Sequence, residues 1–114
     1  MTSPTHAILD NLSRLIGTPR DGALLRFSLG NEYLKAGDAA QAAEHLRDAV
    51  AKDPAYSAAW KLLGRALTES GDLSAALAAY RNGLVAAEGK GDKQAAKEMT
   101  VFARRLAIQL GGQA

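Results

Sequence analysis

The chain has 114 residues, of which 47% are hydrophobic and 23% are charged, a balance typical of a single soluble globular domain spanning residues 1–114. It contains no cysteine, which excludes disulfides, thiolate catalysis and cysteine-based zinc sites, and which is compatible with the cytoplasm, where we expect the protein to be located. The formal net charge of +2 is too small to indicate nucleic acid or an anionic membrane as a partner. Because no apolar run approaches the ~18 residues of a membrane-spanning helix, we expect no membrane segment.

The composition predicts an all-α chain. Alanine occurs 24 times and leucine 16 times, whereas valine and isoleucine occur only three times each. Alanine and leucine are strong helix formers, and the β-branched residues that favour strands are scarce. The first predicted helix covers residues 5–17, where Ile8, Leu12 and Leu15 recur at i, i+4 and i+7 and so share one helical face.

The middle of the chain repeats itself. Residues 23–56 and 57–90 form two blocks of 34 residues, and a period of this length with two helices per unit is typical of a solenoid. The identical pairs are Leu29 and Leu63, Gly30 and Gly64, Gly37 and Gly71, Asp38 and Asp72, Ala42 and Ala76, and Arg47 and Arg81.

Two kinds of glycine recur in these blocks. Gly37-Asp38 and Gly71-Asp72 predict a helix end followed at once by a helix start, since glycine suits the left-handed position after a helix and aspartate caps the next one. Gly30 and Gly64 fall inside predicted helices, where glycine costs about 1 kcal/mol relative to alanine. We therefore expect a neighbouring helix to approach them closely, through its small Ala42 or Ala76.

At these positions the sequence resembles the tetratricopeptide repeat family. The second block carries Trp60, Leu63, Gly64, Leu67, Ala76 and Tyr80 of the family pattern, and the first carries Leu29, Gly30, Tyr33, Ala42, Leu46, Ala49 and Pro54. The sequence departs from the pattern at Arg26 in place of tryptophan, Gly83 in place of alanine and Glu88 in place of proline. Losing that proline predicts that the helix starting near Leu73 continues to about Ala87.

The resemblance implies a short right-handed α-solenoid of about six antiparallel helices. The helix over 5–17 would be half a repeat, followed by repeats over 23–56 and 57–90 and by a capping helix over 92–110. This last helix carries an apolar stripe, made of Met99, Phe102, Ala103, Leu106 and Leu110. Its register is open, because Glu98 falls where a strict repeat would place glycine or alanine.

The resemblance also implies a function, because such repeats are typically non-catalytic scaffolds that bind protein segments in a concave groove. Carried over by position, the expected groove residues are Phe27, Asn31, Leu34, Lys35, Lys61, Arg65 and Thr68. The expected partner is an unidentified protein or peptide with apolar and acidic side chains. Phe27 and Leu34 would anchor its apolar groups, and Lys61 and Arg65, at i and i+4, would hold a carboxylate.

Two alternatives remain open at this stage. Phe27 and Leu34 could instead pack under a neighbouring helix while both cations are merely solvated. The same surface, or the terminal helix, could form a homodimer without a foreign ligand. Some proteins of the family grip a chaperone's C-terminal carboxylate with a clamp of Lys, Asn, Asn, Lys and Arg, but only Asn31 matches that pattern, so we do not expect this role.

The sequence predicts no catalytic residue, cofactor site or metal site. His6 and His45 belong to no pair of ligands on one helical face, and Gly89-Lys90-Gly91-Asp92 lacks the spacing and the preceding strand of a phosphate-binding loop. The terminal helix is basic, but it lacks the dense cations and stacking aromatics of a nucleic-acid site. Enzyme and nucleic-acid binder are therefore distant alternatives.

Overall fold

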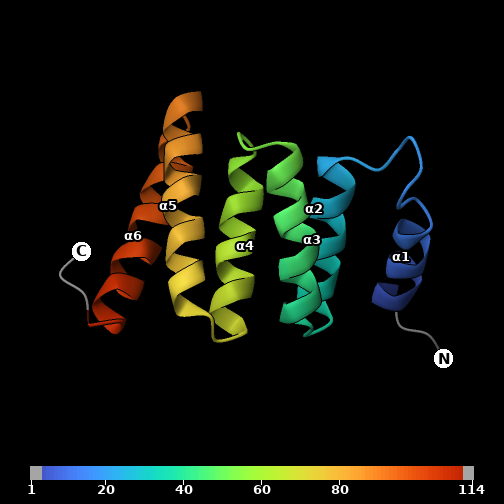
Figure 1. Ribbon diagram of the computed structural model, residues 1–114, viewed down its shortest axis with the longest axis horizontal. Coiled ribbons are helices and arrows are strands. Elements are labelled where there is room, and N and C mark those ends of the chain that lie inside the picture. Colours follow the sequence, from blue (N-terminus) through green and yellow to red (C-terminus); the bar gives the residue numbers. More distant parts are fainter. Residues whose placement is uncertain (1–3, 112–114) are drawn as a thin grey trace.

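The structure, a computed structural model, describes residues 4–111, and all regular secondary structure in this range is α-helical. The helices are α1 (Pro4–Ser13), α2 (Ala23–Lys35), α3 (Ala39–Lys52), α4 (Ser57–Glu69), α5 (Leu73–Lys90) and α6 (Lys93–Gln109). They stand side by side along an elongated molecule that measures 47 × 29 × 21 Å (Figure 1). Each helix packs against the next in the chain, and α4 also contacts α2 and α6. This arrangement confirms the predicted all-α solenoid.

Glycine and aspartate together make the tight junctions. Gly37 and Gly71 adopt left-handed φ angles of 80° and 88°, and the Asp38 and Asp72 carboxylates each accept a hydrogen bond from a backbone amide of the following helix. The same device recurs before α6, where the Asp92 side chain caps the helix. Three of the five connections between helices are therefore specified by local chemistry.

The two mid-helix glycines lie in close contact with large side chains, not with alanines. A Cβ atom on Gly30 would clash with Leu46, and one on Gly64 would lie 2.6 Å from Cε1 of Tyr80. Leu46 and Tyr80 come one helical turn after the expected Ala42 and Ala76. The close approach was predicted correctly, but the partner was wrong: the space left by glycine is filled by a bulky neighbour.

The first helix is shorter than predicted. α1 ends at Ser13 instead of continuing to Gly17, and turns follow in which Leu15 donates its backbone amide to Leu12 and Thr18 donates to Leu15. Leu15 still packs on a small apolar cluster formed by Leu9, Leu25 and Leu29. The apolar periodicity thus extends beyond the end of the helix, which explains the overestimate.

Arg26 joins three segments at the start of the first repeat. Its guanidinium donates to both carboxylate oxygens of Asp21 at 2.9 and 3.0 Å, and to Asp48 at 2.8 Å. It also lies 3.2 Å from Nδ1 of His45, whose ring stacks on Tyr33. The turn before α2, α2 itself and α3 are therefore held together by one side chain.

The register of α6 differs from that of a strict repeat. α2 and α4 begin 34 residues apart, at Ala23 and Ser57, but α6 begins at Lys93, two residues later than that period predicts. The cause is α5, which has 18 residues against the 14 of α3. Thr100, not Glu98, consequently takes the place that corresponds to Gly64.

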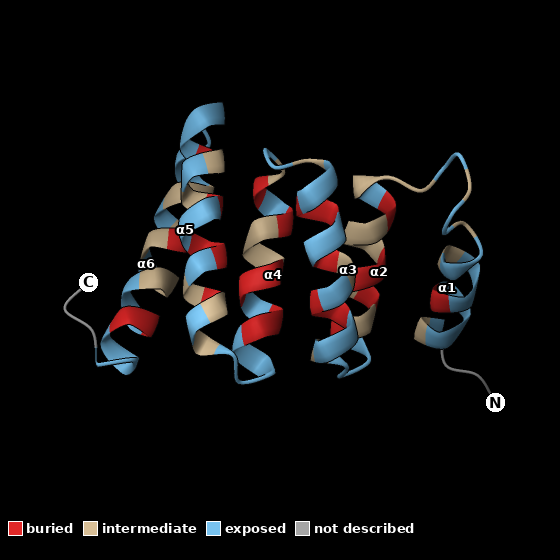
Figure 2. Cartoon of the chain, in the orientation of Figure 1, coloured by how far each residue is buried: buried red, intermediate tan, exposed pale blue. Residues whose placement is uncertain are grey.

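Most of the core is one continuous cluster that runs from α2 to α6. Its buried residues lie on the faces that the helices turn toward one another (Figure 2). Leu46 and Met99 are fully buried in it, the first between α2 and α3 and the second between α5 and α6. Leu9 belongs instead to the separate cluster between α1 and α2.

Candidate functional site

Four helices enclose one hollow on the side of the molecule where α2, α4 and α6 lie next to one another. Its volume is about 550 Å³. The residues that line it are Phe27, Asn31, Ala58, Lys61, Leu62, Arg65, Tyr80, Glu98 and Phe102. α2 and α4 supply the first six, α5 supplies Tyr80, and α6 supplies the last two.

The apolar wall of the hollow is aromatic. The Phe27 ring stacks on Tyr56, with ring centroids 5.0 Å apart, and the Tyr80 ring lies 5.2 Å from that of Phe102. Burial raises the pKa of the Tyr80 phenol, which therefore stays neutral at physiological pH. Because aromatic rings offer a large contact area at a small entropic cost, this wall suits an inserted apolar side chain.

The charged wall holds two ion pairs. The Lys61 ammonium lies 2.7 Å from the Glu98 carboxylate of α6, and the Arg65 guanidinium lies 2.8 Å from Glu69 in its own helix. Side chains in both pairs are substantially exposed, at 39% and 37% for Lys61 and Glu98. Exposed pairs of this kind contribute only about 0–1 kcal/mol. A ligand carboxylate can therefore replace either glutamate at little cost.

The hollow brings together four of the seven predicted groove residues, namely Phe27, Asn31, Lys61 and Arg65. The side-chain amide of Asn31 makes no hydrogen bond within residues 4–111, so it is available to the backbone of a ligand.

The other three predicted residues do not line the hollow. Leu34 is buried in the core at 8% exposure. Lys35 pairs with Glu32, and the Thr68 hydroxyl donates to the Gly64 carbonyl. Leu34 therefore follows the alternative in which it packs under a neighbouring helix and does not face a ligand.

Sequence reasoning missed the partner of Lys61. A strict 34-residue period aligns Glu98 with Gly64, inside the packing between helices, whereas the two-residue shift of α6 turns it toward α4. Tyr80 was missed as a lining residue because it occupies a position that the repeat normally uses for packing, and Leu62 was not among the predicted groove residues. Their alignment with Phe27 depends on how the helices tilt, which no spacing in the sequence encodes.

Among residues 4–111 no group of three or more His, Asp or Glu side chains could hold a metal ion. No helix in that range is long and apolar enough to cross a membrane.

The comparison with protein families decides what kind of solenoid this is. The tetratricopeptide repeat model matches residues 27–96, which include all of α3, α4 and α5, most of α2 and the start of α6. The chain is a tetratricopeptide repeat protein. A tetratricopeptide repeat-containing protein of Pseudomonas aeruginosa, PA0015, is 54% identical to it over 99 residues, which cover 87% of this chain and 94% of the relative.

Solved structures of similar proteins agree. The solution structure of protein BPP2914 from Bordetella parapertussis is 41% identical and superposes with a TM-score of 0.74, covering 96% of this chain and 91% of that one. The crystal structure of MamA gives a TM-score of 0.66 over 94% of this chain and 71% of that one. At 19% identity the likeness to MamA shows the fold alone. The family is a class of interaction and scaffold modules, which directs attention to the surfaces of this tetratricopeptide repeat protein.

Proposed function

We propose that the protein is a non-catalytic cytoplasmic adaptor that binds a protein segment in the hollow between α2, α4 and α6. The observation that carries the proposal is the pairing of an aromatic wall, with Phe27 and Phe102, and a charged wall, with Lys61 and Arg65, around one cavity. Such a cavity suits a segment in which an apolar residue lies close to an acidic one.

The size of the hollow supports a short contact and a modest affinity. About 550 Å³ accommodates only a few side chains, and the binding energy must offset the ordering of the segment. Replacing Glu98 at Lys61 by a ligand carboxylate conserves one ion pair, so the charged contact contributes to specificity more than to affinity.

Photocrosslinking from position 31 tests the proposal. A photoreactive amino acid replaces Asn31, the segment captured in cells is identified by mass spectrometry, and the matching peptide is synthesised. We expect the peptide to contain an acidic residue within a few positions of an apolar one. Its Kd should rise at least about tenfold for Lys61→Glu/Arg65→Glu, because reversal repels the carboxylate.

The matched control is Arg20→Glu/Arg47→Glu, which changes the charge by the same amount at two exposed residues that do not line the hollow. This variant should bind the peptide as the wild type does. Equal binding by the Lys61→Glu/Arg65→Glu variant, or a captured segment without acidic residues, would refute the charged half of the site.

A further inference from the structure

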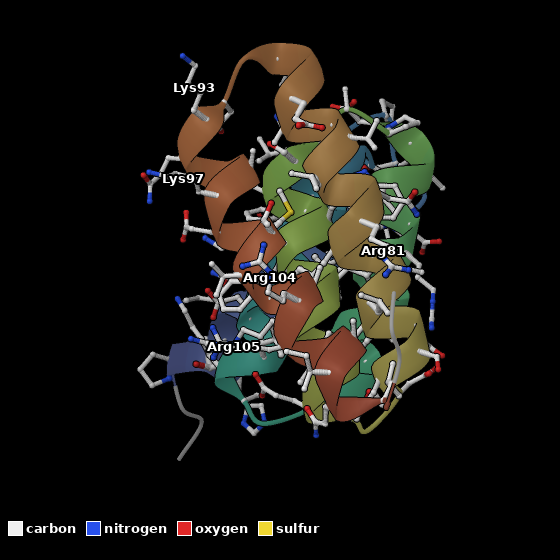
Figure 3. The ribbon with its side chains drawn as sticks, turned by 90° about the vertical axis from the view of Figure 1, so that its left-hand side faces the viewer. Arg81, Lys93, Lys97, Arg104 and Arg105 are labelled. Atoms are coloured by element: carbon white, nitrogen blue, oxygen red, sulfur yellow. The ribbon has the colours of Figure 1, made fainter. Side chains whose placement is uncertain are left out.

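The outer face of α6 carries a second, separate arrangement of charge. Lys93, Lys97, Val101, Arg104, Arg105 and Ile108, here called the basic stripe, recur at i, i+4, i+8, i+11, i+12 and i+15. At 3.6 residues per turn these positions fall within about 120° of the helix circumference. All six are exposed, and Ile108 is exposed to 70%. Figure 3 shows the four cations spaced along α6, and Arg81 on the neighbouring α5.

The cations of the basic stripe have no partners in the part of the chain that the structure describes. The ion pairs of residues 4–111 involve Arg26, Lys35, Lys61 and Arg65, and none of the four cations of the stripe. Glu88 and Asp92 lie near the start of the stripe, beside Lys93 and Lys97. The one acidic residue within α6, Glu98, lies at the edge of the stripe, about 20° around the helix from Arg105, and its carboxylate is paired with Lys61.

Stability of the helix does not account for this pattern. Lys93 is the first residue of α6 and Lys97 lies one turn later, at the end of the helix where the macrodipole disfavours positive charge. The last turn of α6, where a cation would be favourable, contains none. Solubility alone would not call for Val101 and Ile108 to lie exposed among the cations.

We infer that the basic stripe is a docking surface for an acidic amphipathic helix of a partner protein. Among residues 4–111, α6 is the last helix: α2, α3, α4 and α5 each contact helices on both sides, whereas α6 contacts only α5 and α4. A helix laid along the stripe continues the stacking, with its apolar residues on Val101 and Ile108 and its carboxylates on the flanking cations.

The charge of the stripe and its lack of aromatic residues favour this occupant over three others. A second copy of the chain would bring four cations against four cations, and like charges at a contact oppose association. Nucleic acid would meet no stacking aromatic, because Phe102 packs on Tyr80 on the side of the hollow. A membrane would meet only two short β-branched side chains and none of the aromatic residues that suit the bilayer interface.

A designed peptide tests the inference. The probe is an amphipathic helix of about 18 residues, long enough to follow α6, in which glutamates flank a ridge of leucines. Fluorescence anisotropy of the labelled peptide gives its Kd for the wild type, for Lys97→Glu/Arg104→Glu and for the control Arg20→Glu/Arg47→Glu. Circular dichroism checks that each variant is folded.

The expected result has three parts. The Kd of the peptide rises at least about tenfold for Lys97→Glu/Arg104→Glu. It changes less than about twofold for the control and for Lys61→Glu/Arg65→Glu. Added salt weakens the binding of the peptide to the wild type, because it screens the charges. The inference is overturned if the peptide does not bind the wild type, if it binds Lys97→Glu/Arg104→Glu equally well, or if its lysine-for-glutamate analogue binds as tightly. It is also overturned if duplex DNA or phosphatidylserine-containing vesicles bind the wild type more tightly than the peptide.

Discussion

Arg26 and Trp60 show how different side chains can perform the same task at equivalent places in a repeat. Trp60 donates its indole N–H to the Pro54 carbonyl at 2.7 Å, which ties α4 to the turn that precedes it. Arg26 ties α2 to its own preceding turn through Asp21. The departure from the family pattern at position 26 therefore replaces an aromatic anchor by an ionic one, and it also reaches α3 through Asp48.

The ionic anchor makes stability depend on pH. Burial, and next the nearby Arg26 charge, lower the pKa of His45, while Asp48, Glu44 and Asp21 oppose that shift. Below the unfolded pKa of about 6.5, the unfolded chain binds a proton that the folded chain resists, so stability falls as the pH drops. Wild type should lose stability to urea between pH 7 and 5, and His45→Gln should lose less.

Asp21 acts in a different pH window, which keeps the two effects separable. Hydrogen bonds from Arg26, and then from the Gly17 amide, hold the pKa of Asp21 well below its usual range. Its contribution is complete above the unfolded pKa of about 3.9 and is lost only on further acidification. Parallel losses in wild type and His45→Gln between pH 7 and 5 would therefore contradict the role given to His45.

Two glycines of α5 should respond to alanine in opposite directions. A Cβ atom on Gly83 would lie 2.7 Å from the Trp60 Cβ and would clash with Met99, whereas one on Gly89 would meet nothing within 4 Å. Gly83→Ala should destabilise the fold by about 1–3 kcal/mol through overpacking. Gly89→Ala should stabilise it by about 0.5–1 kcal/mol, since alanine is the better helix former. Thermal unfolding measures the stability of both variants. A Gly83→Ala protein as stable as the wild type would contradict the packing described around Gly83.

At the scale of helices, the sequence predicted starts and ends best where a single residue decides them. The glycine–aspartate junctions mark the ends of α2 and α4 because a left-handed φ and a side-chain cap are local requirements. The end of α1 was less accurate: Gly17, at the predicted end, has a left-handed φ of 80°, but the helix gives way to turns before it. The end of α5 was placed too early because no left-handed residue lies near Ala87, and the glycine that ends the helix is Gly91. The extra turn of α5 then set the register of α6 and placed Glu98 beside Lys61.

α1 should be the least protected helix. It is held by the small cluster of Leu9, Leu25 and Leu29, separate from the main core. Because solenoid stability is a sum over neighbouring units, Leu9→Ala should speed amide hydrogen exchange in α1 while leaving α4 nearly unchanged. Leu46→Ala, in the fully buried centre, should instead speed exchange in α2 through α5. Equal effects of both substitutions on α4 would show that the chain opens as one unit.

For the molecule as a whole, the sequence predicted the architecture and part of the site. Phe27, Asn31, Lys61 and Arg65 meet at one hollow because equivalent positions of stacked repeats lie next to each other. Leu34 lies in the core instead, since small rotations of a helix decide whether a side chain reaches the cavity or the core. The identity of a ligand is not encoded in such geometry, which specifies only the chemistry that a partner must present.

The separate attachment of α1 has a consequence for the long-term behaviour of the protein in solution. When α1 opens, Leu25 and Leu29 of α2 lose their cover and present an unpaired apolar ridge to other molecules. Such a ridge on a half-opened solenoid is a nucleus for aggregation, reached without unfolding the main core. The N-terminal helix therefore protects the protein from aggregation by covering this ridge. Fusions or tags that strain α1 should shorten the time for which the protein stays dispersed.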